Sequence, residues 1–169
     1  MQDIRIRPAL ADEAEALNEI AVRATRNDGY GPEAISRMQP ALEFSLALLA
    51  SGLVFAAELE EGRLVGAIGI RPMHWSRLFT LEGLFVEPAF QRRGIGRALF
   101  EHGLRRARRL RGAAMLISAN PNSEGFYAAM GAIRIGEAPF AYLPRVRLPI
   151  LAVPIRPEPA AQGPAFEQP

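Results

Sequence analysis

A glycine-rich turn with several arginines follows an apolar stretch and gives the first sign of chemistry in this chain. The turn reads Gln91-Arg92-Arg93-Gly94-Ile95-Gly96, and Arg97 comes next. The stretch before it, Leu81 to Val86, reads as a strand, and Gly94 to Arg111 has the apolar period of a helix. Glycines carry no Cβ, so backbone N–H groups at a helix start can approach a phosphate, where the helix dipole favours negative charge. Such turns also occur at strand–helix junctions for purely steric reasons, so this one alone is a weak indication of an anion site.

A second polar stretch follows the next apolar run, Ala113 to Ile117. It reads Asn120-Pro121-Asn122-Ser123-Glu124-Gly125-Phe126-Tyr127-Ala128-Ala129-Met130-Gly131-Ala132, in the order N-x-x-S-x-x-F-Y-x-x-x-G. Together the two stretches resemble the GCN5-related N-acetyltransferase (GNAT) superfamily. Its acetyl-CoA signature is Q/R-x-x-G-x-G/A after the fourth strand and N-x-x-A-x-x-F-Y-x-x-x-G after the fifth. Ser123 stands where the family usually has alanine, which is a small departure.

The resemblance implies a mixed α/β fold. Its central sheet is mixed and mostly antiparallel, with a splayed parallel pair of strands, and helices flank it. Acetyl-CoA is then the co-substrate, with its pyrophosphate on backbone N–H groups from Arg92 to Arg97 and its pantetheine arm beside the fourth strand. The cofactor-binding residues that the resemblance implies are Leu84, Phe85, Val86, Gln91, Arg92, Arg93, Gly94, Ile95, Gly96, Arg97, Asn120, Ser123, Phe126 and Tyr127.

Two catalytic residues follow from the same resemblance, each with a structural alternative. Tyr127 occupies the family's general-acid position, where a phenol protonates the departing thiolate; the alternative is an aromatic core residue paired with Phe126. Glu82 matches the position whose carboxylate binds or deprotonates the amine, directly or through a water. The alternative is a strand carboxylate paired with an arginine. By strand alternation we expect Glu82 on the same face as Leu84 and Val86. Asn120 is expected to bind the pantetheine arm, and its alternative is an Asn-Pro turn.

Composition excludes several other kinds of chemistry. All 20 basic residues are arginine, which removes Schiff-base chemistry and a P-loop lysine. No cysteine is present, so disulfides and thiolate nucleophiles are excluded, and direct attack by the amine is favoured over an acyl-enzyme route. Two isolated histidines, His74 and His102, build no metal centre, and no metal is expected. The net charge is only +2, so no nucleic-acid partner is indicated by the pI of 9.6.

Hydrophobic period and turn residues divide the chain into alternating strands and helices. We predict strands at Ile4 to Pro8, Leu53 to Glu58, Arg63 to Ile70, Leu78 to Val86, Ala113 to Ser118, from Ala132 to Ile135 onward, and at Leu148 to Val153. We predict helices at Leu10 to Arg26, Pro32 to Met38, Ala41 to Ala50, Gly94 to Arg111 and Ser123 to Met130. The loop 27–32 and the two helices after it are expected to face the acceptor.

The sequence therefore predicts one catalytic domain over residues 1–155, followed by a proline-rich flexible tail at 156–169. No apolar run is long enough to span a membrane, and a cytoplasmic location is expected. The expected function is transfer of acetyl from acetyl-CoA to a primary amine of a small molecule or peptide, in a ternary complex. The alternative is a non-catalytic module that binds or senses acyl-CoA, and a homodimer is a further expectation. His74 and Trp75 are expected in a surface loop, with a wall of the substrate pocket as the alternative.

Overall fold

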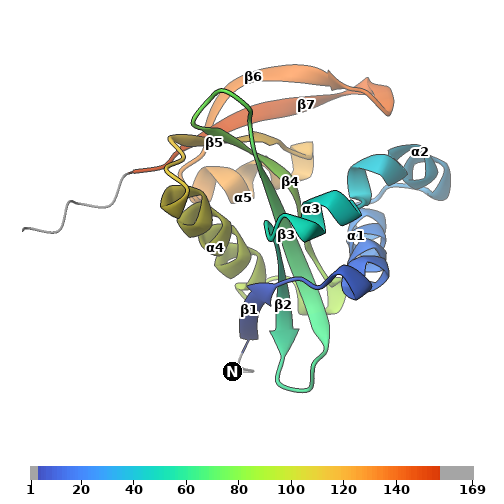
Figure 1. The fold of residues 1–169 in the computed structure, drawn as a ribbon. Coiled ribbons are helices and arrows are strands. Elements are labelled where there is room, and N and C mark those ends of the chain that lie inside the picture. Colours follow the sequence, from blue (N-terminus) through green and yellow to red (C-terminus); the bar gives the residue numbers. More distant parts are fainter. Residues whose placement is uncertain (1–3, 157–169) are drawn as a thin grey trace, which may run out of the picture.

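A seven-stranded sheet with helices on both sides forms the molecule (Figure 1), in a computed structural model that describes residues 4–156. The strands are β1 (Ile4–Pro8), β2 (Val54–Leu59), β3 (Leu64–Pro72), β4 (Leu78–Val86), β5 (Ala114–Ser118), β6 (Ile133–Phe140) and β7 (Leu143–Pro154). Their order in the sheet is β1-β2-β3-β4-β5-β7-β6. Strands β4 and β5 are parallel and the other neighbours are antiparallel. This is the mixed α/β architecture that the sequence predicts.

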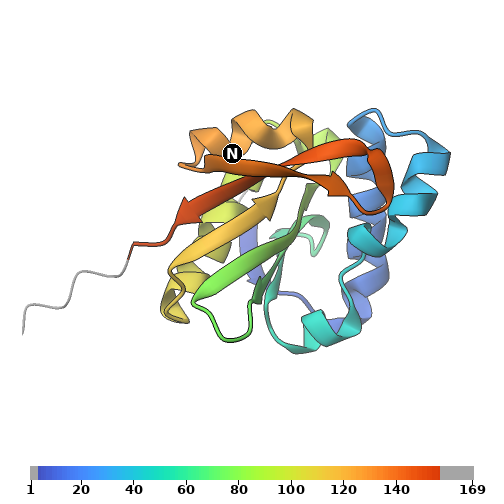
Figure 2. The same ribbon diagram turned by 90° about the horizontal axis from the view of Figure 1, so that it is seen from above.

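Helices cover the sheet on opposite sides, as Figures 1 and 2 show. On one side lie α1 (Ala14–Asn27), α2 (Pro32–Leu42) and α3 (Leu46–Ala50), and on the other lie α4 (Ile95–Arg109) and α5 (Glu124–Ala129). Short 3-10 turns precede three of the helices, at Ala11–Glu13, Pro88–Phe90 and Pro121–Ser123. Among the described residues, no helix combines the length and the apolar character that a membrane span requires.

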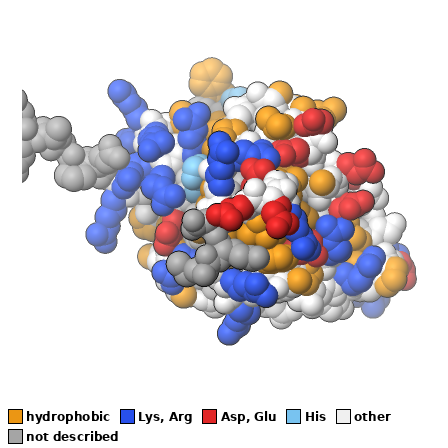
Figure 3. Space-filling model, turned by 90° about the horizontal axis from the view of Figure 1, so that it is seen from below, with side chains coloured by type: hydrophobic (Ala, Val, Ile, Leu, Met, Phe, Trp, Pro, Cys, Tyr) orange, Lys and Arg blue, Asp and Glu red, His pale blue; other side chains and the backbone are white. Residues whose placement is uncertain are grey.

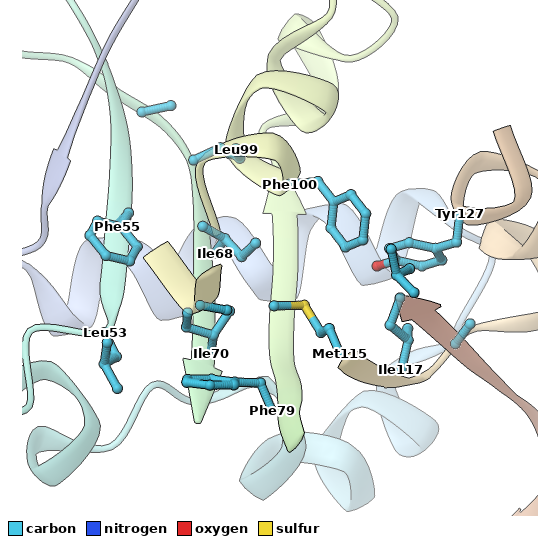
Figure 4. Packing of buried hydrophobic residues seen from close by; sticks show 14 of the residues in the cluster. Leu53, Phe55, Ile68, Ile70, Phe79, Leu99, Phe100, Met115, Ile117 and Tyr127 are labelled. Carbon is cyan, nitrogen blue, oxygen red and sulfur yellow. The ribbon is translucent and has the colours of Figure 1, made fainter. Parts of the chain in front are cut away.

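Two apolar layers hold these helices against the sheet. On the α4 side, Leu99 and Phe100 pack against Ile68 and Met115, all fully buried (Figure 4). On the other side, Leu17 of α1 and Leu48 of α3 pack against Val54 and Ala56 of β2. Close approach on this side depends on Gly69, because a Cβ there would lie 2.7 Å from the Phe44 ring. The sheet is therefore buried on both faces over most of β2 and β3.

A bulge in β4 changes which way its side chains point. Ile70 pairs with Leu81 and Gly69 pairs with Gly83, so Glu82 is the extra residue. Leu81 and Leu84 therefore both pack with the core on the α4 side. The Glu82 side chain instead bonds to Thr80 and Arg71. The expectation that Glu82 shares a face with Leu84 and Val86 is wrong, because the inserted residue breaks the two-residue period.

The parallel pair β4 and β5 stays together over only three residues. Leu78, Phe79 and Thr80 pair with Ala114, Met115 and Leu116. Beyond this point β4 continues beside β3, whereas β5 continues beside β7 as far as Ser118. The splayed parallel pair that the sequence analysis expects is therefore present.

Helix limits near the N-terminus differ from the prediction in two places. The first turn after Leu10 is a 3-10 turn, and α1 begins only at Ala14. Glu13 closes that turn by accepting from the Leu10 N–H at 2.8 Å and from Arg7 at 2.6 Å. The predicted break at residues 39 and 40 falls instead after Leu42, because α2 runs through Pro40 and the chain turns at residues 43–45. There the Phe44 N–H donates to Asn18, and Ser45 caps α3.

The β6–β7 hairpin is longer than the sequence analysis predicts. Strand β7 begins at Leu143 and not at Leu148, and β6 runs on to Phe140. Prolines at 139, 144 and 149 argue locally against strands. Pro139 lies at a register shift on β6, which is the edge strand, where a proline is tolerated. The hairpin also packs back onto α2. Of the flexible tail expected at 156–169, residues 157–169 lie outside the described residues.

Candidate active site

A cavity of about 740 Å³ opens where β4 and β5 diverge. Its floor comes from the second half of β4 and the end of β5. Its walls come from the loop after α1, from α2, from the start of α4, from α5 and from the β6–β7 hairpin. A volume of this order is typical of small-molecule sites. The cavity therefore lies where β4 and β5 stop pairing, and it is large enough to hold a small ligand.

The glycine-rich turn forms one end of this cavity. Arg92 has φ +64° and Gly94 has φ +84°, so the chain enters α4 through two left-handed residues. The first backbone bond of the helix is that from the Ala98 N–H to the Gly94 carbonyl, so the N–H groups of residues 95–97 precede the helical ladder. A non-glycine residue held at positive φ beside free amide groups is a feature of anion-binding turns. The turn thus has the geometry that binds phosphate.

Tyr127 lies on the cavity lining and is 6% exposed. Its ring packs edge-on against Phe100 at 5.4 Å and against Phe126 at 5.0 Å, and Figure 4 shows it reaching in beside Phe100. Burial raises the pKa of the Tyr127 phenol above its ordinary value. The phenol is therefore neutral and keeps its proton at physiological pH. The ring is packed in the core, as the structural alternative expects, and it also lines the cavity. The role of Tyr127 as the general acid stays a prediction.

Glu82 also lines the cavity, at the bulge of β4. One carboxylate oxygen accepts from the Thr80 hydroxyl and the other from Arg71, both at 2.7 Å. The side chain of Glu82 is 26% exposed and that of Arg71 is 55% exposed, so solvent screens this ion pair. A carboxylate has about four acceptor positions, so two remain after these bonds. The arginine pairing foreseen as an alternative is present, and the carboxylate still has positions to accept from a ligand.

Comparison with known proteins assigns the chain to a family. A sequence profile described as the Acetyltransferase (GNAT) family matches residues 15–132, which is more than half of the chain. The chain belongs to this family of N-acetyltransferases. The matched range contains the diverging strands, the glycine-rich turn and Tyr127. A search of the curated proteins finds no match.

Solved structures share the fold of this GNAT protein at low sequence identity. The PaiA N-acetyltransferase of Thermoplasma acidophilum, in complex with coenzyme A, has a TM-score of 0.74 at 17% identity, over 90% of this chain and 99% of that one. A GNAT acetyltransferase of Staphylococcus aureus Mu50 has a TM-score of 0.73 at 18% identity, over 91% and 100%. The ribosomal-protein-S18-alanine N-acetyltransferase of Escherichia coli has a TM-score of 0.66 at 20% identity, over 97% and 100%. The agreement extends over nearly the whole length of each chain.

Acetyl-CoA is the co-substrate of this family, and most of the residues expected to bind it line the cavity. These are Leu84, Phe85, Val86, Gln91, Arg92, Gly94, Gly96, Asn120, Ser123, Phe126 and Tyr127. Three expected residues do not. Ile95 is 2% exposed within the core, the Arg93 guanidinium lies over the Phe90 ring at 5.1 Å, and Arg97 pairs with Glu101 at 3.9 Å.

Gln91 and Asn120 already use their side chains within the protein. Gln91 donates to the Val86 carbonyl at 3.2 Å and accepts from Asn27 at 3.2 Å, which ties the end of β4 to the end of α1. Asn120 accepts from the Asn122 N–H at 3.1 Å, as an Asn-Pro turn requires. Its amide also donates to Asp28 at 3.3 Å. The turn expected as the alternative for Asn120 is therefore present, and binding of the pantetheine arm by its side chain stays a prediction.

Sequence reasoning missed Asp28 as a site residue, although it placed the loop 27–32 near the acceptor. Asp28 and Tyr30 both line the cavity. Asp28 as a whole residue is exposed. Partial burial of its carboxylate nevertheless raises the pKa of Asp28, and the hydrogen bond from Asn120 lowers that pKa by a smaller amount. Burial, and next the charge of Asp28, raise the pKa of Tyr30. The sequence around Asp28 gives only a turn signal, because its partners Asn120 and Asn122 are more than 90 residues away.

Other candidates from the sequence lie away from the cavity. Trp75 is fully exposed, and neither it nor His74 lines the cavity, so the surface loop expected for both is what the structure shows. Arginines gather at one end of the surface in Figure 3, and the last turn of α4 carries Arg106, Arg108 and Arg109. His102 packs on Phe55 at 4.5 Å, and burial followed by the neighbouring arginines lowers its pKa. The described part of the chain holds no cluster of residues that fits a metal ion.

Proposed function

We propose that this GNAT protein transfers acetyl from acetyl-CoA to a primary amine by direct attack in a ternary complex. The observation that carries the proposal is the gap between β4 and β5, because it places Tyr127, Glu82 and the phosphate-type turn around a single cavity. A thioester and an amine held side by side in such a gap react as neighbours, without the entropy cost of meeting. Since the chain has no cysteine, a thiol acyl-enzyme is excluded.

The proposed reaction moves two protons. The amine nitrogen forms a bond to the thioester carbonyl carbon, and the carbon–sulfur bond breaks with its electron pair on sulfur. We assign the Tyr127 hydroxyl as the donor of the proton that the thiolate receives, since burial keeps this phenol protonated. The proton lost by the amine passes to Glu82, directly or through a water. Thr80 and Arg71 support this role, because their bonds orient the carboxylate and leave acceptor positions open.

The rival function is a module that binds acyl-CoA without catalysis, and one experiment separates the two. The protein is incubated with acetyl-CoA and a panel of primary amines, and released thiol is measured alongside the melting temperature with acetyl-CoA alone. Acetylation predicts a raised melting temperature together with amine-dependent release of thiol. A raised melting temperature without thiol release for any amine supports the binding module, and no effect in either measurement refutes both.

We propose a second copy of this chain as a further partner, at the edge strand β6. Among the described residues β6 pairs only with β7, and Ile133 and Ile135 on it are 61% and 60% exposed. An exposed edge strand with apolar side chains is a site for strand pairing between copies. Light scattering on the purified protein is expected to give a dimer, and Ile135→Arg is expected to give a monomer. A wild-type monomer at all concentrations tested would rule the proposal out.

A further inference from the structure

The acceptor end of the cavity has a wall made almost entirely of apolar side chains. Six residues from distant parts of the sequence form it, namely Tyr30, Met38, Leu42, Phe85, Phe140 and Leu148. Met38 and Leu42 lie one turn apart on α2, so they present one continuous surface. Met38 and Leu42 are 7% and 5% exposed, so the wall is packed in place and not assembled from free surface side chains.

Contacts behind this wall hold it in position. Phe85 and Phe140 pack against the cluster of α1 and α2 residues to which Met38 and Leu42 belong. The Phe85 ring also meets Phe44 edge-on at 6.0 Å, and the Phe140 ring meets Tyr142 at 5.4 Å. The wall is thus preorganised, and an apolar group that enters it meets little rearrangement.

The charges on the cavity lining are arranged unevenly. Of the described lining residues three are charged, and these are Asp28, Glu82 and Arg92. Arg92 belongs to the turn at the phosphate end, and the nearest other cation to Glu82 is Arg71, which already pairs with it at 2.7 Å. An ammonium group therefore finds carboxylates here. Among the described residues that line the cavity, no cation lies at this end, so a carboxylate or phosphate on the acceptor would lose its hydration there without compensation.

We propose that the acceptor is a small primary amine that carries one apolar alkyl or aryl group and no anionic group. This inference rests on the proposed function, because it concerns the same cavity. A polyamine is disfavoured because it brings no apolar group to the wall and so loses the apolar contact that the wall offers. A peptide is disfavoured because its backbone N–H and C=O groups would lose water against the apolar wall without gaining partners there.

Four amines distinguish the chemical classes in a thiol-release assay with saturating acetyl-CoA. They are 2-phenylethylamine, phenylalanine, spermidine and a tripeptide with N-terminal alanine. We expect kcat/KM for 2-phenylethylamine to exceed that for each of the others by about tenfold or more, the range that one well-placed apolar or unpaired polar group produces. Phenylalanine is the matched comparison, because it adds only a carboxylate. The inference is overturned if any of the other three amines is turned over as fast as 2-phenylethylamine or faster. It is also overturned if none of the four amines is turned over.

Variants of Phe140 test whether the wall itself sets this preference. Phe140→Ala is expected to lower kcat/KM for 2-phenylethylamine about tenfold. Phe140→Arg is expected to narrow the gap between 2-phenylethylamine and phenylalanine, since it places a cation where the carboxylate lies. Trp75→Ala removes an exposed aromatic residue outside the cavity and is expected to leave both rates unchanged. A preference that is unaltered in both Phe140 variants overturns the assignment of the wall.

The same measurements separate failure of this inference from failure of the proposed function. If acetyl-CoA raises the melting temperature and another class of amine turns over best, acetylation stands and the inference falls. If acetyl-CoA neither raises the melting temperature nor supports turnover of any amine, the proposed function falls, and the inference falls with it.

Discussion

Gly96 offers a direct test of the cofactor end of the site, because the structure separates its effect on folding from its effect on binding. It is the second residue of α4 and lines the cavity. A Cβ at this position would lie 3.7 Å from the Phe126 ring and 3.7 Å from a methyl group of Val86, which is ordinary van der Waals contact. The protein therefore has room for alanine. Replacing glycine by alanine within a helix stabilises by about 0.5–1 kcal/mol.

Valine at the same position adds methyl groups that extend about 1.5 Å beyond the Cβ. A methyl group directed at Phe126 or Val86 would come well inside contact distance, so at least one methyl must point into the cavity. We therefore expect Gly96→Ala to raise the melting temperature of the free protein by about 1–4 °C and to keep its response to acetyl-CoA. We expect Gly96→Val to fold and to lose that response.

The size of the response follows from ligand linkage. At a hundredfold excess over Kd, acetyl-CoA adds about 2.7 kcal/mol to the free energy of unfolding. If valine weakens binding a hundredfold, the same ligand concentration adds about 0.4 kcal/mol. For a chain of this length the shift in melting temperature then falls from about 5–11 °C to about 1–2 °C. Differential scanning fluorimetry with and without acetyl-CoA measures both values.

Two results would contradict this reasoning. A full acetyl-CoA shift in a folded Gly96→Val variant would mean that the ligand does not approach the start of α4. A lower melting temperature for Gly96→Ala would mean that the added Cβ clashes with Phe126 or Val86 instead of making ordinary contact. Gly94 is the poorer site for this test, because its φ of +84° makes any side chain there cost about 1–2 kcal/mol of folding free energy, whatever it does to the ligand.

Three further predictions concern side chains of the cavity. Tyr127→Phe keeps the ring that packs on Phe100 and removes the proposed acid, so thiol-release assays should show kcat lowered about a hundredfold with the acetyl-CoA shift unchanged; a wild-type rate would leave Tyr127 as a packing residue only. If Glu82 is the base, Glu82→Gln should flatten the acidic limb of the kcat/KM pH profile, and activity should recover as pH rises towards the pKa of the amine. If Glu82 only binds the cation, the variant should raise KM and leave the shape of the profile unchanged. If neither change is seen, Glu82 is a structural carboxylate. Asp28 has a raised pKa, so the folded state binds more protons than the unfolded state and its contribution to stability falls as pH rises above about 3.9. Asp28→Asn removes this pH-dependent destabilisation, so urea unfolding should show the variant becoming more stable relative to wild type from pH 4 to pH 7. If the variant becomes less stable relative to wild type over that range, the pKa of Asp28 is not raised in the folded state.

The sequence predicts the turn and the segment that form the proposed cofactor end of the cavity, because both are encoded locally. The turn from Gln91 to Gly96 and the segment from Asn120 to Tyr127 each lie within one strand–turn–helix unit. Glycine positions, turn residues and helical period specify such a unit without reference to the rest of the chain. The mixed, mostly antiparallel sheet and the splay of β4 from β5 are implied by the family resemblance, and the structure confirms both.

The orientation of Glu82 could not be predicted in the same way. A bulge is a relation between two strands, and it depends on which residues of β3 face β4. Counting every second residue back from Val86 and Leu84 passes over the bulge and therefore assigns Glu82 to the wrong face. Asp28 escaped prediction for a related reason, because its partner Asn120 is distant in sequence and nothing near Asp28 indicates the contact.

The acceptor wall is the feature of the cavity that depends most on residues far apart in the sequence. Met38 lies on α2 and Phe140 lies on the β6–β7 hairpin, about a hundred residues later, and the two meet only because that hairpin packs back onto α2. No short motif can specify a surface of this kind. Changes in α2 or in the hairpin can therefore alter which amine fits, while the turn proposed to bind the cofactor stays unchanged. Such variants should change the order of preferred amines and leave the acetyl-CoA shift of the melting temperature intact, since the two ends of the cavity are built from different elements.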